Sequence, residues 1–235
     1  MENFFLDRRR GDAPKLAELR GHLHKRIAGR GCLVIGSAPN PVFPVSDGMF
    51  RVCVNGSVNS AYKYLSAPPD LTYLNGAIFT DRDAYSAATL EVLRGRDIGD
   101  VLIARHTYQE ACATLGEINA TFGLSMPLSK YDKRVILGEA IGHSLLGRYR
   151  FDANVSNGLF MAAVALWGGA SKVVLVGFSF NSRHDYCKDK ELSARGHVRE
   201  DTLFLEVVAA SRLAVETTST EIHGNFGIRL AAGSP

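Results

Sequence analysis

The chain has 235 residues, of which 46% are hydrophobic and 22% charged, and a formal net charge of +3 at pH 7. That length suits one sizeable α/β domain and is short for two. The near balance of charge argues against a broad nucleic-acid surface, which needs clustered Lys and Arg side chains. We therefore expect an ordinary soluble domain that does not bind nucleic acid.

The N-terminal segment MENFFLDRRR places its apolar residues before its basic ones, the reverse of a secretory signal peptide. No apolar run approaches the roughly 18 to 20 residues needed to cross a bilayer. The sequence thus predicts a cytoplasmic protein. FFLDRRR is compatible with a weak peripheral contact at the inner face of the membrane, although a frayed terminus is the favoured interpretation. The four cysteines are scattered and form no C-x-x-C pair, so neither a disulfide framework nor a zinc site is expected.

The predicted secondary structure alternates between helices and strands. It opens with an amphipathic helix over 13–28, whose Leu and Ile residues recur every three or four positions. CLVIG at 32–36 is a continuous apolar run, typical of a strand buried on both faces. The further strands expected from the pattern lie at 50–56, 71–76, 101–104, 172–180 and 219–224. The further helices lie at 81–94, 107–116, 157–169 and 200–215.

Strands that alternate with helices imply right-handed crossovers, and hence an α/β fold with a doubly wound, mostly parallel sheet and helices on both faces. We expect an N-terminal amphipathic helix in 1–29 and a single domain over 30–235. The stretch 117–152 has weak periodicity and mixes Gly, Pro and basic residues. We interpret it as a lid or an insertion.

Polar residues follow the first three predicted strands. In an open parallel sheet, ligands bind beyond the carboxyl ends of the strands. Asn55 and Asn75 each begin an Asn-Gly pair there, and side-chain amides offer both a donor and an acceptor to ribose and phosphate. The alternative is that Asn-Gly only favours a left-handed turn. The first strand runs into Gly36, Ser37, Ala38, Pro39 and Asn40.

Two later segments are also candidates for a binding site. Ser156, Asn157 and Gly158 stand where a helix begins, and the free backbone N–H groups of a first turn can hold an anion. A capped helix without a ligand is the alternative. The loop over 181–199 contains donors suited to a phosphate leaving group, and an ordinary surface loop is its alternative. Its candidate residues are Arg183, His184, Tyr186 and His197, the last placed as a general base.

Taken in order, these motifs resemble those of the bacterial sialyltransferases of glycosyltransferase family 42, which transfer sialic acid from CMP-sialic acid. The resemblance runs in patches from about residue 32 to about residue 222. Gly36-Ser37-Ala38-Pro39-Asn40 is similar to the family's Gly-Asn-Gly-Pro-Ser turn, with Ser37 in place of its Asn. The other matches are Cys53-Val54-Asn55 to Arg-Cys-Asn, Leu74-Asn75-Gly76-Ala77 to Tyr-Asn-Pro-Ser, Ser156-Asn157-Gly158 to Thr-Ser-Gly, and Gly196-His197 to Gly-His.

The resemblance implies a single Rossmann-like, glycosyltransferase A-like domain and an inverting, metal-independent enzyme. Its substrates would be a CMP-activated sialic acid or related nonulosonic acid and a glycan acceptor hydroxyl, and a homo-oligomer stays open. His197 would be the general base, and the family's two phosphate-stabilising tyrosines would be represented by Tyr186, with Arg183 and His184 as substitutes. The donor would contact Gly36, Ser37, Ala38, Asn40, Asn55, Asn75, Ser156, Asn157, Gly158 and His184.

Three alternative functions stay open. Asp81-Arg82-Asp83 is a D-x-D match that would bind a divalent cation in a metal-dependent glycosyltransferase, although acidic residues also favour a helix start. An ATP-dependent enzyme related to pterin pyrophosphokinases shares a similar order of Gly-rich turns. The third alternative is an inactive nucleotide-binding module.

Overall fold

The computed structural model describes residues 12–81, 83–142, 155–181, 184–187, 197–211 and 213–233. Its centre is one eight-stranded sheet in the order β5-β4-β3-β2-β1-β6-β7-β8, and every neighbouring pair is parallel. The strands are β1 (Gly31–Ile35), β2 (Phe50–Val54), β3 (Leu71–Leu74), β4 (Asp100–Ala104), β5 (Ser125–Leu128), β6 (Lys172–Val176), β7 (Val215–Thr217) and β8 (Arg229–Leu230). The expected α/β class with a doubly wound parallel sheet is confirmed.

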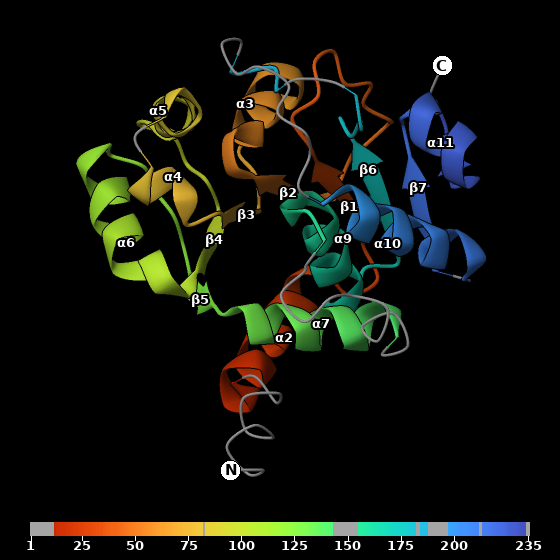
Figure 1. Ribbon diagram of the computed structural model, residues 1–235, viewed down its shortest axis with the longest axis horizontal. Coiled ribbons are helices and arrows are strands. Elements are labelled where there is room, and N and C mark those ends of the chain that lie inside the picture. The colour runs from red at the N-terminus through yellow and green to blue at the C-terminus, as the bar shows by residue number, and fades with distance from the viewer. Residues whose placement is uncertain are drawn as a thin grey trace.

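Helices cover both faces of this sheet. In Figure 1, α4, α5 and α6 gather beside β3, β4 and β5, whereas α9 and α10 lie by β1 and β6. The longer helices are α2 (Ala13–Ile27), α5 (Ala84–Leu93), α6 (Tyr108–Glu117), α7 (Lys130–Ile141), α9 (Asn157–Trp167), α10 (Val198–Ala210) and α11 (Thr220–Phe226). The short elements are η1 (Asn55–Ser57), α3 (Val58–Ser60), η2 (Ala61–Leu65), α4 (Ala77–Thr80) and η3 (Arg105–Thr107).

The central strand β1 explains why its sequence is apolar without alternation. Successive side chains of a strand point to opposite faces. Cys32 and Val34 belong to the core layer that contains α2, α7 and α9. Leu33 and Ile35 belong to the layer under α5 and α6. Because both faces are covered, every position of β1 after Gly31 is buried.

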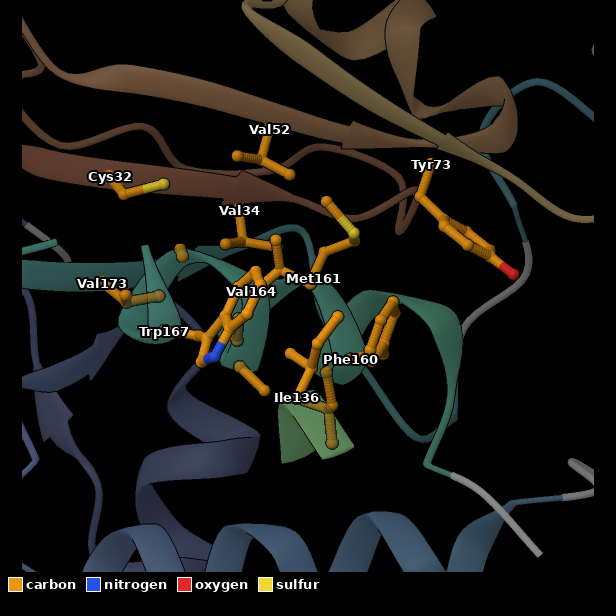
Figure 2. Packing of buried hydrophobic residues seen from close by; sticks show 14 of the residues in the cluster. Cys32, Val34, Val52, Tyr73, Ile136, Phe160, Met161, Val164, Trp167 and Val173 are labelled. Atoms are coloured by element: carbon orange, nitrogen blue, oxygen red, sulfur yellow. The ribbon is translucent and has the colours of Figure 1, made fainter. Parts of the chain in front are cut away.

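Helix α9 lies against the middle of the sheet and is buried almost all round. Figure 2 shows its side chains packed under β1 and β2, with Phe160 beside Tyr73 of β3. The centroids of these two rings are 5.7 Å apart. The N-terminal helix α2 packs in the same core, through Leu16, Leu19, Leu23 and Ile27. The first turn of α9 is therefore held rigidly at the end of the sheet.

The prediction of a strand at 219–224 is wrong. Those residues lie in α11, which starts because the Ser219 hydroxyl accepts a hydrogen bond from Ile222 N at 3.3 Å. The last strands are β7 before this helix and β8 after it.

The region 117–152, for which we predicted a lid or an insertion, contributes to the body of the fold. Residues 125–128 form β5, the edge strand beside β4, and residues 130–141 form α7 in the core. Residues 143–152 of that region lie outside the described residues. Within the described residues, every helix is too short or too polar to span a bilayer.

Candidate active site

The carboxyl ends of β1 and β6 meet at the centre of the sheet, where the strand order changes direction. Gly36 N donates to Val176 O at 2.7 Å, and Ala38 N donates to Gly177 O at 3.0 Å. A Cβ atom on Gly36 would lie 2.3 Å from Gly177 O, so only glycine fits this crossing. In doubly wound folds this change of direction is where ligands bind.

A second link joins the same two loops. The Ser37 hydroxyl and His184 Nδ1 form a hydrogen bond, and Asp185 N donates to Ser37 O at 2.8 Å. The structure therefore brings together two residues that we proposed from separate motifs. Ser37, which stands where the sialyltransferase motif has Asn, is short enough to leave room for the imidazole of His184.

Asn55 connects the ends of β2 and β3. Its Oδ1 accepts from Asn75 N at 2.8 Å, and its Nδ2 donates to the Tyr85 hydroxyl at 3.0 Å. Asn55 is buried and has a φ of 51°, in the left-handed region that Asn tolerates better than most residues. Asn55 therefore makes the left-handed turn, and its amide joins the ends of two strands, while contact of this amide with a nucleotide stays a prediction.

An aromatic cluster lies beside this amide. The ring centroids of Tyr85 and His184 are 5.2 Å apart, those of Tyr85 and Tyr186 5.9 Å, and those of His184 and Tyr186 5.5 Å. Tyr186 packs so closely on Gly56 that a Cβ atom there would lie 2.3 Å from its ring. Burial raises the pKa of the Tyr186 phenol, and the neighbouring Tyr85 raises it further. The Tyr186 phenol is therefore a neutral donor at physiological pH.

The start of α10 is tied to the start of α9. The carboxylate of Asp201, in the first turn of α10, accepts from Ser156 N at 2.6 Å. His197 is the exposed N-cap residue of α10, and its side chain makes no capping hydrogen bond. This link places His197 and the turn Ser156–Gly158 on neighbouring helix ends. The imidazole of His197 therefore does not cap α10.

Phe178, two residues after the end of β6, lies against both Gly36 and Gly158. A Cβ atom on Gly158 would lie 2.6 Å from its ring, and one on Gly36 would lie 3.1 Å from it. The ring fills the space that both glycines leave. The turn after β1 and the start of α9 therefore face the same region.

The remaining predicted residues have different outcomes. Asn40 is exposed with a φ of 52°, which is accounted for by the turn. Arg183 lies outside the described residues. Asp83 caps α5 by accepting from Ser86 N at 2.7 Å, while Asp81 is exposed at the end of α4. In the described part of the chain, no group of three or more His, Cys, Asp or Glu side chains is arranged to hold a metal ion.

Sequence reasoning missed four residues that complete this arrangement. They are Tyr85, Lys133, Phe178 and Asp201. Two had a readable signal, since Phe178 follows the most apolar strand and Asp201 lies four residues after His197. Tyr85 and Lys133 had none, because Tyr85 lies within the expected helix over 81–94 and Lys133 within the stretch of weak periodicity over 117–152.

The geometry defines a class of protein, a parallel α/β fold with polar side chains gathered at its central strand ends. No family model matches the sequence, and no curated protein matches it at a significant level. Solved structures do match. The monofunctional α-2,3-sialyltransferase Cst-I from Campylobacter jejuni aligns with a TM-score of 0.55 and 12% identity, over 86% of this chain and 81% of that one.

Two further structures from Campylobacter jejuni give the same result. An α-2,3-sialyltransferase in its apo form aligns with a TM-score of 0.53 and 14% identity, over 89% of each chain. The sialyltransferase CstII, in complex with the substrate analogue cytidine-5'-monophosphate, aligns with a TM-score of 0.55 and 15% identity, over 88% of this chain and 86% of that one. The expected structural resemblance to bacterial sialyltransferases is thus confirmed, at the level of the fold.

Proposed function

We propose that this protein is an inverting glycosyltransferase that moves a sialic acid or related nonulosonic acid from a CMP-activated donor to a glycan hydroxyl. The observation that carries the proposal is the gathering of residues from separate motifs at one end of the sheet. Ser37 bonds to His184, the Asn55 amide accepts from Asn75 N, and the turn 156–158 is joined through Asp201 to the helix that begins after His197. The shared fold with sialyltransferases, one of them crystallised with CMP, supports the choice of donor.

In the proposed reaction, His197 acts as the general base. It removes the proton from the acceptor hydroxyl as that oxygen attacks the anomeric carbon of the donor sugar. The bond between the anomeric carbon and the phosphate oxygen breaks, and its electron pair leaves with CMP. A single displacement of this kind inverts the configuration at the anomeric carbon.

The departing phosphate needs donors near its oxygens. We assign this role to the phenol groups of Tyr85 and Tyr186 together with the backbone N–H groups that begin α9. Arg183 and His184 stay candidates for the same role. Tyr85 supplies the second tyrosine that the sequence comparison did not find. No step in this scheme requires a metal ion.

Thermal shift with nucleotides tests the donor class. At about 100 times its Kd, a ligand adds about 2.7 kcal/mol of stability, which raises the melting temperature of a chain this size by roughly 5 to 10 °C. We expect that increase with CMP, and we expect EDTA to leave it unchanged. Stabilisation by ATP with Mg²⁺ alone, or by UDP only with a divalent cation, would contradict the proposal in favour of one of the alternatives.

The base is tested by His197→Ala. We expect the transfer rate, or the slow hydrolysis of the donor, to fall by about 10² to 10⁴ while the affinity for CMP stays the same. The matched control is His24→Ala, which removes an exposed histidine of α2 and leaves the rate unchanged. A near wild-type rate in His197→Ala removes this residue from the mechanism.

A further inference from the structure

Lys133 is a partly buried cation that the proposed reaction does not use. It lies on α7, and its Nζ is 4.2 Å from the ring centroid of Tyr73 and 4.9 Å from that of Phe160. Both rings are buried. Burial lowers the pKa of this lysine to about 7. A lysine in such surroundings reduces the stability of the fold unless a specific contact compensates.

In the part of the chain that the structure describes, that contact is with Asn157. Lys133 Nζ donates to Asn157 Oδ1 at 3.0 Å, and no described carboxylate pairs with the ammonium group. The adjacent carboxylate of Asp132 pairs with Lys15, whose Nζ lies 2.5 Å from it. It also accepts hydrogen bonds from the backbone N–H groups of Asp12 and Ser129. The lysine therefore holds an uncharged amide, and not a counter-ion.

This hydrogen bond determines which end of the Asn157 amide remains available to a ligand. Asn157 is the first residue of α9, directly after the N-cap residue Ser156. An ammonium group can only donate, so it accepts no bond from the amide and binds only its oxygen. The NH₂ end of Asn157 is then left to donate to another group. It adds side-chain donors to the backbone N–H groups of the first helical turn.

We propose that Lys133 is a positioning residue, which holds the Asn157 amide so that its NH₂ group donates to an acceptor atom of the bound nucleotide. That acceptor is an oxygen of the phosphate or an acceptor atom of the base. The inference rests on the proposed function, because it needs a nucleotide at the start of α9. It goes further by assigning a role to a residue on a different helix.

The same geometry makes nucleotide binding depend on pH. Below pH 7 the ammonium form dominates and the amide has one orientation. As the pH rises through the pKa of about 7, the neutral amine gains a lone pair that also accepts hydrogen bonds, and the amide can turn over. Affinity for the nucleotide should therefore fall as the pH rises. The elements around Lys133 carry other ionisable groups, among them Tyr73 of β3, Lys15 of α2, Asp201 of α10, and Lys130, Tyr131, Asp132, Arg134 and Glu139 of α7 itself, while α9 and β5 carry none.

The test is a double-mutant cycle on the full chain, with CMP binding measured by calorimetry in wild type, Lys133→Met, Asn157→Ala and the double variant. We expect each single variant to bind CMP about tenfold more weakly, and the double variant to bind no more weakly than Asn157→Ala. Melting curves of Lys133→Met control for folding, because Met fills the apolar space between the two rings and should not lower the melting temperature. Repeating the cycle with cytidine separates the sources: a loss that persists assigns the acceptor to the nucleoside, and one seen only with CMP assigns it to the phosphate.

The pH series supplies a readout that a purely structural lysine would not move. Between pH 6.5 and 8.5, wild type should lose about fivefold in CMP affinity relative to Lys133→Met at the same pH. All other ionisable groups are shared by the two proteins, so the ratio of the two affinities isolates Lys133. Additive losses in the cycle, or an unchanged affinity in Lys133→Met, would overturn this inference alone. If wild type does not bind CMP at all, the proposed function fails, and the inference fails with it.

Discussion

The two ends of the sheet both carry polar side chains, but of different kinds. At the amino end, α2 and the starts of the strands are joined by ion pairs. Asp100 Oδ2 lies 2.6 Å from His22 Nε2 and also pairs with Arg26, and Asp70 pairs with Arg51 at 3.0 Å. At the carboxyl end, the side chains in contact are mostly neutral amides, hydroxyls and rings, namely Ser37, Asn55, Tyr85, His184 and Tyr186.

The difference shows how to tell a structural polar cluster from a candidate site. At the amino end, each carboxylate faces a cation and also accepts a backbone N–H, from Leu124 to Asp100 and from Arg51 to Asp70. A ligand there would have to break ion pairs that are already made. Neutral donors at the carboxyl end hold one another by single hydrogen bonds, which a nucleotide can replace at little net cost. We therefore interpret the ion pairs between α2 and the strand starts as structural, and the neutral donors at the carboxyl end as the candidate site.

The largest expected effect comes from breaking the amino-end network with Asp100→Ala. This change removes the partner of His22 and Arg26 and leaves Leu124 N without its acceptor. We expect a loss of about 3 kcal/mol in the free energy of unfolding. For a chain of this length that corresponds to a melting temperature lower by roughly 6 to 12 °C. Calorimetric or circular-dichroism melting measures it, and the stabilisation that CMP adds should be unchanged.

Glu91→Ala is the control for this prediction. Glu91 pairs with Arg94 on the exposed face of α5, at 3.0 Å, with side-chain exposures of 73% and 54%. Surface pairs of this kind contribute little, and we expect a change within about 0.5 kcal/mol. A drop in Asp100→Ala as small as that of the control would mean that the ion pairs do not hold the amino end.

At the carboxyl end, Tyr85→Phe is expected to reduce stability less than Asp100→Ala does, and to reduce CMP affinity, which Asp100→Ala should not. The substitution removes the hydroxyl that accepts from Asn55 Nδ2 and so releases the amide that joins two strand ends. We expect about a tenfold loss in CMP affinity and a loss of about 1 kcal/mol in stability. Titration of CMP together with melting curves measures the two effects in one preparation.

Tyr62→Phe is the matched control, because the Tyr62 hydroxyl also makes one hydrogen bond, to Asp97 O at 2.9 Å, but away from the carboxyl end. It should lose similar stability and keep full CMP affinity. Equal CMP affinities in the two variants would show that the Tyr85 hydroxyl does not contribute to nucleotide binding. The carboxyl end would then differ from the amino end in its chemistry but not in its function.

The central part of this fold was predictable from the sequence because buried parallel strands are continuous apolar runs. β1, β2, β3, β4 and β6 were all found in this way. β5 escaped because it is a short edge strand, SMPL, with a proline and only alternate residues buried. The strand at 219–224 was misplaced because Ile222 lies in a polar stretch, where the capping hydroxyl of Ser219 decides for a helix.

The contacts at the candidate site were predictable for residues that follow strand ends, and not for residues that a helix brings in from elsewhere in the chain. Ser37, Asn55 and Asn75 stand directly after strands, so the parallel topology alone places them together. Tyr85 lies 30 residues after Asn55, inside α5, and only the crossover brings the two into contact. Lys133 reads as one more basic residue in KYDKRV, and its contact with two rings depends on how α7 packs against β3 and α9. Long-range packing of this kind leaves no local pattern.

The smallest expected effect belongs to the Asp81-Arg82-Asp83 motif, and it decides between the metal-independent proposal and its metal-dependent alternative. Asp83→Ser replaces the carboxylate with a hydroxyl that also caps helices, so stability should change by no more than about 0.5 kcal/mol. Asp83→Ala, which loses the cap, should cost about 1 kcal/mol. If the only role of the carboxylate is to cap α5, both variants keep the wild-type transfer rate. Added Mg²⁺ or Mn²⁺ then leaves the transfer rate of wild type and of both variants unchanged. A metal-dependent transferase would instead lose most of its rate in Asp83→Ser, the variant whose fold is least disturbed. A transfer rate that falls when the carboxylate is removed, even though the helix cap is kept, would therefore place the active site near the start of α5 and not at the β1–β6 crossing.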